Sequence, residues 1–355
     1  MTTRRIRVLV VEDSPTVRAR LCEILGGDAG VEVVGTAADG KEAIDLCLKL
    51  RPDVVTLDMM LPVMSGLAAT EYIMAHCPTP ILVVSASTNR GELFKTYDAL
   101  AAGAVDVLDK AGAGDTDGEW EAKLIGAVKL VSRIKVITHP RARLDAVLAA
   151  RTANVGHPAT PRAARLSALA LGASTGGPGA IMAVLKQLPG SLRTPLFLVI
   201  HIGEPFGSAF AEWLDGQTEH RVTFARDGQK VPGGEVLMAP PDRHLVIRGG
   251  RAWLTTDAER HSCRPSVDVL FESLAAEYGN RVLAALLTGM GRDGAAGLLR
   301  IRQAGGLTIA QDEASSVVWG MPREAVLLGA AERVLPLDAI GPALAAASVA
   351  TGASP

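Results

Sequence analysis

Short apolar runs alternate with amphipathic helical patterns along the first 110 residues of the chain. The stretches between the runs, such as residues 14–25 and 40–50, repeat apolar positions with the period of an α-helix. This alternation is typical of consecutive βα units, which form a parallel sheet with helices on both faces. The pattern therefore predicts a five-stranded, doubly wound α/β domain. The strand candidates are RIRVLVV, VEVVGTA, DVVTLD, ILVVSA and AVDVLDK.

The periodic pattern breaks once and then returns. A helical stretch, EWEAKLIGAVKLVSRIKVI, closes a first domain over residues 1–137, and residues 138–165 gain Pro, Ala and Arg without periodicity, which indicates a linker. From residue 166 the alternation predicts a second α/β domain over residues 166–350, with a mostly parallel sheet and an irregular β insertion near residues 221–256. Its strand candidates are SALALGAS, PLFLVIH, GEVLMAP, RVLAALLTGM and GLTIAQ.

Length, charge and cysteine content narrow the class of protein. A chain of 355 residues exceeds the size at which a single core stops growing, so it suits two domains. The net charge of -2 offers no broad attraction to nucleic acid, and the four cysteines lack the C-x-x-C spacing of disulfide or zinc frameworks. No apolar run approaches the roughly 20 residues of a membrane span, and the N-terminus has no signal-peptide pattern. We therefore expect a cytoplasmic protein with no nucleic-acid partner and no membrane insertion.

Five polar residues stand at the predicted carboxyl ends of strands in the first domain. Glu12 and Asp13 end the first strand, and Asp58 ends the third. Ser85 ends the fourth strand, and Lys110 ends the fifth. Ligands bind at this edge of an open parallel sheet. Three carboxylates there suit a hard cation such as Mg²⁺, and an aspartate beside that cation can attack a phosphoryl group while a lysine neutralises charge.

The motifs VLVVEDSPTVR, PDVVTLDMMLPVMSGL and GAVDVLDK resemble the response-regulator receiver domain, which has a flavodoxin-like fold, over about 120 residues. The resemblance implies that Asp58 accepts the phosphoryl group and that Ser85 and Lys110 contact it. The Mg²⁺ ligands that it implies are Glu12, Asp13, Asp58 and the backbone carbonyl of Met60.

Two positions depart from the receiver pattern. Ala111 follows the lysine where receivers usually have proline, and this change bears on the geometry of the last loop. Val107 stands three residues before the lysine where receivers usually have an aromatic residue. That change bears on whether an aromatic side chain relays phosphorylation.

The stretch LSALALGASTGGPGAIMAVL, residues 166–185, runs from an apolar strand through a glycine-rich turn into an apolar helix. A helix N-terminus can bind phosphate on its backbone N–H groups. Equally, the segment GASTG fits the G-x-S-x-G spacing that presents a serine, here Ser174, as a nucleophile. A dinucleotide site would need an acidic residue after the next strand, and a P-loop would need a lysine before Ser or Thr. The sequence has neither.

A base and an orienting carboxylate stand at two further strand ends. His201 ends PLFLVIH, and Asp293 follows RVLAALLTGM in the turn GMGRDG. A serine nucleophile needs a base to take its proton and a third group to orient that base. We therefore expect Ser174, His201 and Asp293 to act together in acyl transfer, with no metal or other cofactor in this domain. Their chain order differs from that of α/β-hydrolases, so the arrangement would be convergent.

Other histidines compete with His201 for the role of base. His244 follows a proline-rich turn and begins a strand, which places it at the other edge of the sheet. Ser174 has a second possible role as a helix N-cap, which is compatible with catalysis. The remaining histidines, which we expect to be solvated, are His76, His139, His157, His220 and His261.

The residues after Ser174 would serve the same chemistry. Gly176 and Gly177 let a substrate approach the backbone, and Pro178 suits the first turn of a helix. Free N–H groups near Thr175 can face the oxyanion of an acyl-transfer reaction. The predicted reaction is hydrolysis of an activated acyl group.

Motifs of the second domain, together with the receiver and the linker, resemble the chemotaxis protein-glutamate methylesterase family, CheB. They are LALGASTGGPGA, HLVI after MAPPDR, CRPSVDVLFESLA, LTGMGRDGAAGL and AQDEASSVVWGMPREAV. The resemblance implies that Ser174, His201 and Asp293 hydrolyse γ-glutamyl methyl esters on the cytoplasmic helices of chemoreceptors, releasing methanol. Some members also deamidate glutamine. It further implies oxyanion donors near Thr175 and Met290.

The resemblance also implies a partner and a form of control. A chemotaxis histidine kinase would phosphorylate Asp58, and we expect this to shift the receiver's packing on the catalytic rim and unblock it. After His201 the family usually shows a Met-Pro pair, whereas this chain reads HIGEPF, a change that bears on substrate preference. One alternative is a regulator whose second domain binds a ligand such as a nucleotide without cleaving it. A DNA-binding regulator would need a recognition helix and a basic face, which the sequence lacks.

Overall fold

A computed structural model describes residues 4–86, 90–110, 118–134, 136, 166–203 and 206–349. The chain divides into two compact units, Met1–His157 and Pro158–Pro355. The predicted linker, residues 138–165, lies outside the described residues. So do Ala111 and residues 204–205 of the HIGEPF segment.

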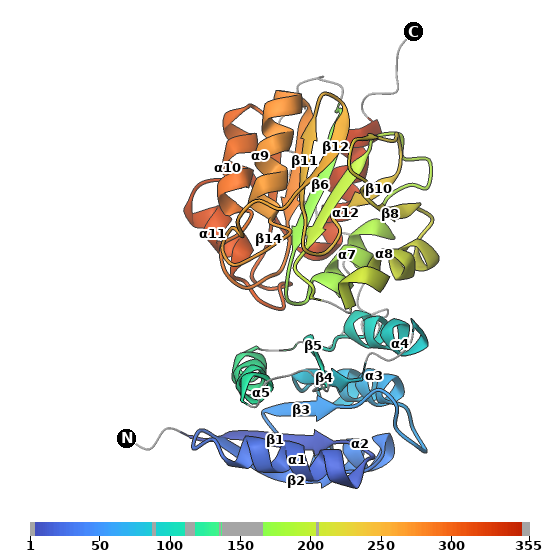
Figure 1. Ribbon diagram of the computed structural model, residues 1–355, viewed down its shortest axis with the longest axis vertical. Helices are drawn as coiled ribbons and strands as arrows, with labels where there is room; N and C mark the ends of the chain where they lie inside the picture. Colours follow the sequence, from blue (N-terminus) through green and yellow to red (C-terminus); the bar gives the residue numbers. More distant parts are fainter. Residues whose placement is uncertain are drawn as a thin grey trace, which may run out of the picture. The chain divides into compact units, whose positions relative to one another are not determined.

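The first unit is a five-stranded sheet in the order β2-β1-β3-β4-β5 (Figure 1), and every neighbouring pair is parallel. Because crossovers between parallel strands are right-handed, this order puts α1 on one face and α2, α3 and α4 on the other. The predicted doubly wound domain is confirmed. The strands are β1 (Ile6–Val11), β2 (Val31–Ala37), β3 (Val54–Leu57), β4 (Ile81–Ser85) and β5 (Asp106–Asp109). The helices are α1 (Pro15–Gly26), α2 (Gly40–Leu50), α3 (Gly66–His76), α4 (Arg90–Ala101) and α5 (Glu119–Val131).

The strand order reverses direction at β1. The chain passes from β1 to β2 on one side and later returns to β3 on the other side. The carboxyl ends of β1 and β3 therefore border the switch point where ligands bind in such sheets. Ser14 begins α1 directly after β1, because its hydroxyl accepts a hydrogen bond from the Val17 N–H and Pro15 suits the first turn.

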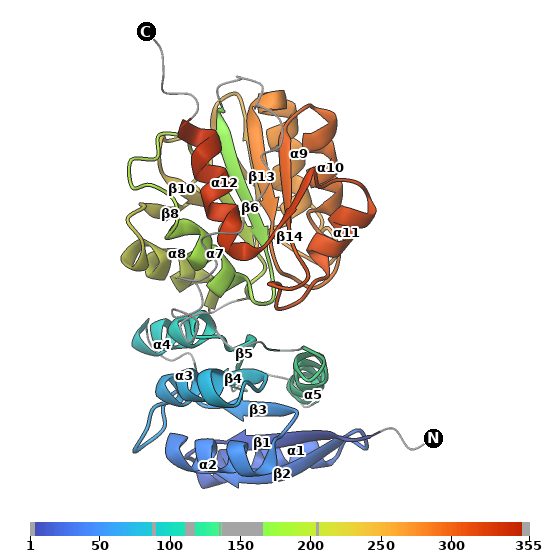
Figure 2. The same cartoon turned by 180° about the vertical axis from the view of Figure 1, so that it is seen from behind.

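The second unit has a seven-stranded sheet in the order β15-β14-β13-β6-β7-β10-β8, again with only parallel pairs. The predicted parallel sheet is confirmed. Helices α9, α10 and α11 lie on one face and α7 and α12 on the other, as Figures 1 and 2 show from opposite sides. The strands are β6 (Ala168–Ala173), β7 (Leu196–Ile200), β8 (Val222–Phe224), β10 (Val236–Met238), β13 (Val282–Leu286), β14 (Leu307–Gln311) and β15 (Arg333–Leu335). The helices are α7 (Gly177–Leu185), α8 (Phe206–Gln217), α9 (Val267–Tyr278), α10 (Ala295–Gln303), α11 (Met321–Leu327) and α12 (Leu337–Val349), with a 3₁₀ turn at Gly279–Arg281.

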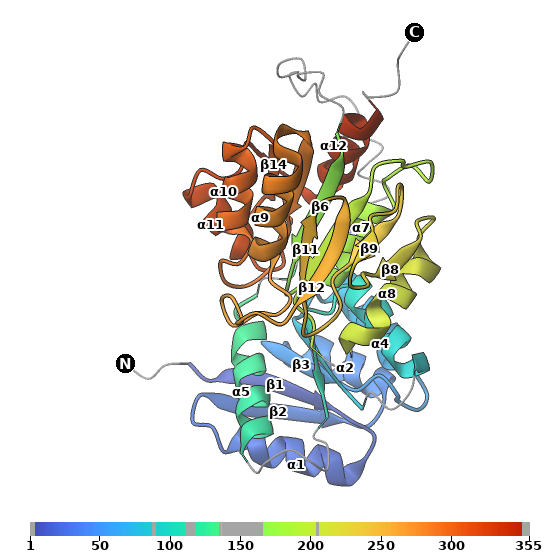
Figure 3. The ribbon, with the colours of Figure 1, turned by 45° about the horizontal axis from the view of Figure 1, so that its top comes forward.

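The segment of residues 221–256 divides between two sheets. Strands β8 and β10 join the main sheet, whereas β9 (Gln229–Lys230), β11 (His244–Arg248) and β12 (Arg251–Thr255) form a separate antiparallel sheet. Figure 3 shows the β11–β12 hairpin beside α9. Gly249 and Gly250 make its two-residue turn, and both have a positive φ, of 59° and 67°.

Helix α9 packs closely on strand β6 at the centre of the main sheet. Strand β6 is buried along its whole length. A Cβ atom on Gly172 would lie 2.3 Å from Val267 Cγ1, so only glycine lets the first residue of α9 pack on this strand. Within the described residues, none of the helices combines the length and the apolar character needed to cross a membrane.

Candidate active site and phosphorylation site

Ser174 and His201 follow two neighbouring strands at the same level of the sheet. Ala173, the last residue of β6, is in register with Ile200, the last residue of β7. The His201 N–H continues this ladder by donating to the Ala173 carbonyl at 3.1 Å. Because paired strands lie about 4.8 Å apart, the two residues start from adjacent positions. They are not hydrogen-bonded to each other in the described part of the chain.

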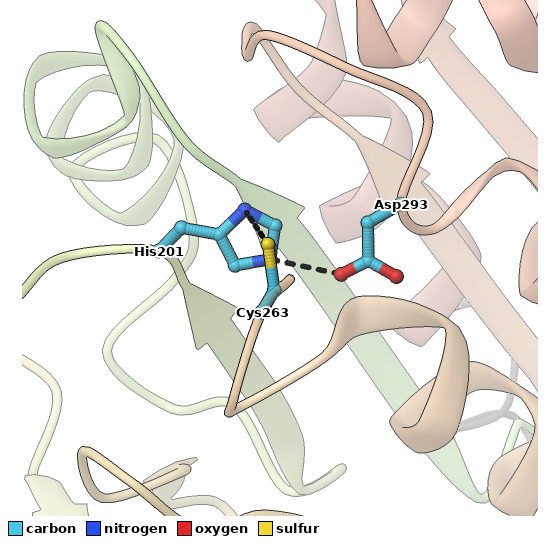
Figure 4. A group of neighbouring side chains, drawn as sticks. All are labelled: His201, Cys263 and Asp293. Atoms are coloured by element: carbon cyan, nitrogen blue, oxygen red, sulfur yellow. Dashed lines mark hydrogen bonds and ion pairs between the residues drawn. The ribbon is translucent and has the colours of Figure 1, made fainter. Parts of the chain in front are cut away.

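Asp293 reaches His201 from the loop after β13, as Figure 4 shows. His201 Nε2 and Asp293 Oδ2 are 2.8 Å apart. The carboxylate is 2% exposed and also accepts hydrogen bonds from the Ser266 hydroxyl and from the N–H groups of Val267 and Asp268. These donors belong to the first turn of α9, where the helix dipole favours negative charge. Asp293 is therefore fixed as an acceptor for His201.

The two partners affect each other's protonation. Burial raises the pKa of Asp293, but the bonds from His201, Ser266 and Val267 outweigh it, so that this pKa lies below its ordinary value. Burial lowers the pKa of His201, but the bonds to Asp293 and Cys263 outweigh it and raise the pKa to about 9. Since Nε2 faces the carboxylate, Nδ1 is the nitrogen left to take a proton from a nucleophile.

Cys263 occupies a place that the sequence does not indicate. Its Sγ lies 3.6 Å from His201 Nδ1, which is the nitrogen not bonded to Asp293 (Figure 4). The cysteines show no C-x-x-C spacing, and no spacing motif links residues 62 positions apart. Ser266 was also missed, although a serine just before an apolar helical run is an N-cap signal that could have drawn attention to it.

The turn after β13 packs directly on Ser174. A Cβ atom on Gly289 would lie 2.8 Å from Ser174 Cβ, so the backbone comes this close only because the residue is glycine. The Ser174 N–H donates to the Thr288 carbonyl at 3.0 Å. In contrast, the N–H groups of Thr175 and Met290 donate to no other described residue. Two backbone donors that have no acceptor among the described residues thus lie near Ser174.

The other two histidines of this region have structural partners. His244 is fully buried, accepts from the Ser266 N–H at 3.1 Å on Nδ1, and has Nε2 3.2 Å from the Ala258 carbonyl. His261, which we expected to be solvated, is 3.1 Å from the buried carboxylate of Asp268 instead. A pocket of about 490 Å³ lies beside these groups, and its lining includes His261, Cys263, Met290 and Asp293.

In the first unit, four of the predicted residues meet at the switch point. Ligand oxygens of Glu12, Asp13 and Asp58 lie within 4.8 Å of one another. Lys110 Nζ is 2.8 Å from Glu12 Oε2 and 3.0 Å from Asp58 Oδ2. Ser85 ends β4, where it pairs in register with Asp109, the residue before the lysine. Asp58 and Glu12 are both nearly inaccessible, at 4% and 1% exposure.

This acidic group carries more negative than positive charge. Burial raises the pKa of Glu12. The contact with Lys110 lowers this pKa and the charge of Asp58 raises it, so that the pKa of Glu12 lies above its ordinary value. Burial lowers the pKa of Lys110, but Glu12 and Asp58 outweigh it and raise the pKa. Glu12 Oε2 is buried, has no hydrogen bond and faces Lys110 only as an ion pair. One lysine does not balance three carboxylates, so the donors suit a divalent cation.

The remaining predicted positions of this unit lie around the group. Met60 is in the turn after Asp58 and is 44% exposed. Val107 lies in β5 beside Val83, so an aliphatic side chain stands where receivers usually have an aromatic one. A Cβ atom on Gly66 would lie 2.2 Å from the Asp58 carbonyl oxygen, so glycine is needed where α3 begins against this turn.

Comparison with known proteins finds one family match in each unit. Residues 169–344 match the CheB methylesterase family and residues 8–116 match the response regulator receiver domain. A protein-glutamate methylesterase/protein-glutamine glutaminase of Nitrosospira multiformis is 44% identical over 342 residues, 96% of each chain. A second such protein, from Pseudomonas aeruginosa, is 45% identical over 347 residues, again 96% of each chain.

The solved catalytic domain of Thermotoga maritima CheB methylesterase is 34% identical, covers 51% of this chain and 98% of its own, and has a TM-score of 0.49. Identity of 44% over nearly the whole of both chains, as with the Nitrosospira protein, confirms the resemblance seen in the motifs. The chain therefore belongs to the CheB methylesterase family and carries the response regulator receiver domain at its N-terminal side.

Proposed function

We propose that the second unit is a serine esterase that hydrolyses γ-glutamyl methyl esters on the cytoplasmic helices of chemoreceptors. The observation that carries this proposal is the hydrogen-bonded pair of His201 and the buried Asp293, 2.8 Å apart, at the same sheet edge as Ser174. The curated relatives are named for this ester hydrolysis and for glutamine deamidation. The sequence motifs support receptors as the substrate. The four cysteines, all free, agree with a reducing cytoplasm.

We expect the reaction to take place in two steps. Ser174 Oγ attacks the ester carbonyl carbon while its proton passes to His201 Nδ1, and the resulting oxyanion accepts hydrogen bonds from the Thr175 and Met290 N–H groups. The intermediate expels methoxide, which takes the proton from His201 and leaves as methanol. Water then attacks the acyl-serine with the same base and releases glutamate. With a glutamine side chain the first leaving group is ammonia.

A serine substitution tests this proposal. Ser174→Ala should lower methanol release from methylated receptor by at least about 10⁴-fold, because the nucleophile is lost. Ser191→Ala removes an exposed serine of the same unit and should leave the rate unchanged. Full activity in Ser174→Ala would refute the mechanism. Binding of a nucleotide at the glycine turn with no hydrolysis of any ester would favour the non-catalytic alternative.

We propose further that a histidine kinase transfers a phosphoryl group to Asp58. One Asp58 oxygen attacks phosphorus as the bond to the kinase histidine breaks, with Lys110 and Ser85 contacting the phosphoryl oxygens. Glu12, Asp13, Asp58 and the carbonyl of Met60 would hold Mg²⁺, which supplies neutralisation of the phosphoryl charge when bound. The charge excess around the buried Glu12 oxygen supports this.

Acid-labile phosphate measures this step directly. Asp58→Ala should incorporate none from a phosphorylated kinase in the presence of Mg²⁺, since the acceptor oxygen is gone. Asp45→Ala removes an exposed carboxylate of α2 and should incorporate as much as the unchanged chain. Equal incorporation in both variants would show that another residue is the acceptor.

A further inference from the structure

We propose that Arg292 binds an acidic side chain of the substrate helix, one turn from the ester, and that His261 positions the guanidinium for this contact. The inference rests on the proposed function and adds to it a preference for esters with acidic neighbours. Arg292 is exposed and lines the pocket of about 490 Å³ beside the candidate active site. No step of the proposed ester hydrolysis uses its charge.

Arg292 lies on the turn that carries two other groups of the candidate site. Met290, whose N–H binds the oxyanion in the proposed mechanism, precedes it by two residues, and Asp293 follows it directly. Gly291, between Met290 and Arg292, has a φ of 88°, which favours glycine. Because two residues of chain span at most about 7 Å, the arginine side chain starts close to the place of the ester carbonyl.

His261 holds one end of the guanidinium. Arg292 Nε donates to His261 Nδ1 at 3.3 Å, and His261 Nε2 lies 3.1 Å from Asp268 Oδ2. Asp268 is fully buried, and its Oδ1 accepts from the Gly297 N–H at 2.6 Å. Because an ionised carboxylate only accepts hydrogen bonds, Nε2 carries the ring proton and Nδ1 has the lone pair that Arg292 needs. The direction of the arginine is thus fixed from the buried aspartate outward.

The other guanidinium nitrogens are available to a ligand. Within the part of the chain that the structure describes, Nη1 and Nη2 of Arg292 donate to no residue and form no ion pair. Glu324, which also lines the pocket, lies 3.6 Å from Arg323. The positive charge of Arg292 therefore has no carboxylate partner there. A guanidinium offers two parallel N–H groups that match the two oxygens of a carboxylate, so we expect a carboxylate as the ligand.

The substrate helix supplies such a carboxylate. Hydrolysis of one γ-glutamyl ester leaves a glutamate on the helix, and residues three or four positions apart lie on one face with about 5 to 6 Å between their Cβ atoms. The long side chains of arginine and glutamate span this spacing. Hydrolysis at one position should therefore favour hydrolysis of an ester one turn away.

Two receptor fragments with a single methylated glutamate test this preference. One has glutamate three and four residues before and after the ester, and the other has alanine at those positions. Glutamine is avoided because the relatives are also named glutaminases. For the unchanged full chain, KM should be about 5- to 10-fold lower with the acidic fragment, between the effects of an exposed ion pair and of a hydrogen bond to a charged group. The values of kcat should be equal, because the contact does not change in the transition state.

Arg292→Ala should raise KM for the acidic fragment to the value for the alanine fragment. Arg292→Lys keeps the charge without the planar fork, so it should keep only part of the difference between the fragments. Arg300→Ala is the control, because it removes an exposed arginine of α10 whose side chain contacts only Gln303 among the described residues. It should keep the whole difference.

His261→Ala tests the positioning role. It should give a KM difference between that of the unchanged chain and that of Arg292→Ala, and it should have no further effect on this difference when Arg292 is already alanine. A merely structural role of His261 would change the rates with both fragments equally and leave their ratio intact. That result would overturn the positioning role.

Two outcomes would overturn the binding role of Arg292. One is an equal KM for the two fragments in the unchanged chain, and the other is a KM difference that Arg292→Ala leaves intact. Absence of Ser174-dependent methanol release from both fragments would instead refute the proposed function. Equilibrium binding of the fragments then still tests the contact, since the acidic fragment should bind about 5- to 10-fold more tightly and Arg292→Ala should abolish this difference.

Discussion

At the scale of single residues, His201 combines two opposing requirements. In the proposed mechanism it must be neutral to accept the proton of Ser174, yet its contacts with Asp293 and Cys263 stabilise the protonated form. Its pKa of about 9 means that the imidazole carries a proton at neutral pH in this structure. The carboxylate that orients the base therefore also limits how much of it is available.

This leads to a prediction for the pH profile. Because the pKa is raised, the neutral base is lost as pH falls below about 9, and kcat/KM should fall about tenfold per pH unit there. The measurement is methanol release between pH 6 and pH 10, about three units on the acid side, with the Ser174→Ala rate subtracted as background. A profile that is flat below pH 9 would contradict the assignment of His201 as the base.

Asp293→Asn separates the two effects of the carboxylate in that experiment. The acid limb should move to lower pH, because a neutral amide no longer stabilises the imidazolium. The plateau should fall by about 10³- to 10⁴-fold, because the amide no longer orients the ring. Asp257→Asn, at an exposed carboxylate of the same unit, should change neither.

At the scale of elements, the start of α9 holds the Asp293 carboxylate in the candidate active site, which its place in the sequence does not suggest. Its N-cap, Ser266, accepts from the Val269 N–H and donates to Asp293 Oδ1 at 2.7 Å. The same helix gives two backbone N–H groups to that carboxylate. Gly172 and Gly294 leave room for Val267, so the helix can start against β6. The helix start is thus part of the candidate active site.

Ser266→Ala should therefore affect stability and catalysis together. Loss of the cap and of a bond to a buried carboxylate should lower the free energy of unfolding of the second unit by about 2 to 4 kcal/mol. The esterase rate should fall less than in Asp293→Asn, since both N–H donors remain. Calorimetry of the full chain and methanol release measure the two effects.

Ser65→Ala is the matched control, because Ser65 caps α3 in the first unit, accepts from the Ala68 N–H and donates to no other residue that the structure describes. It should cost about 1 kcal/mol in that unit and leave ester hydrolysis unchanged. If Ser266→Ala behaved in the same way, its contact with Asp293 would have no role in catalysis.

At the scale of the whole molecule, one chain carries a receiver domain and a methylesterase domain in separate compact units. Phosphorylation of Asp58 should raise the esterase rate by about 5- to 150-fold, the range of couplings worth 1 to 3 kcal/mol. The measurement is methanol release by the full chain with and without a phosphorylated kinase. Asp58→Asn should keep the unstimulated rate and lose the increase, and an unchanged response in that variant would contradict control through Asp58.

The sequence predicted the fold because the signals for strands and helices are local. The alternation of apolar runs gave both parallel sheets, and polar residues at strand ends indicated Glu12, Asp13, Asp58 and Lys110, which the structure brings together. The same reasoning pointed to His201 and Asp293, which lie 92 positions apart and are hydrogen-bonded. Their catalytic roles stay predictions for the experiments above.

The features that the sequence did not predict depend on contacts between loops. The division of residues 221–256 between two sheets, the pairing of His261 with Asp268, and the place of Cys263 at His201 Nδ1 depend on contacts between segments far apart in the chain. Periodicity and strand-end position fix where a residue stands on its own element. Only the register of β6 with β7 and the packing of α9 on β6 decide which nitrogen of His201 faces the carboxylate and which faces the thiol.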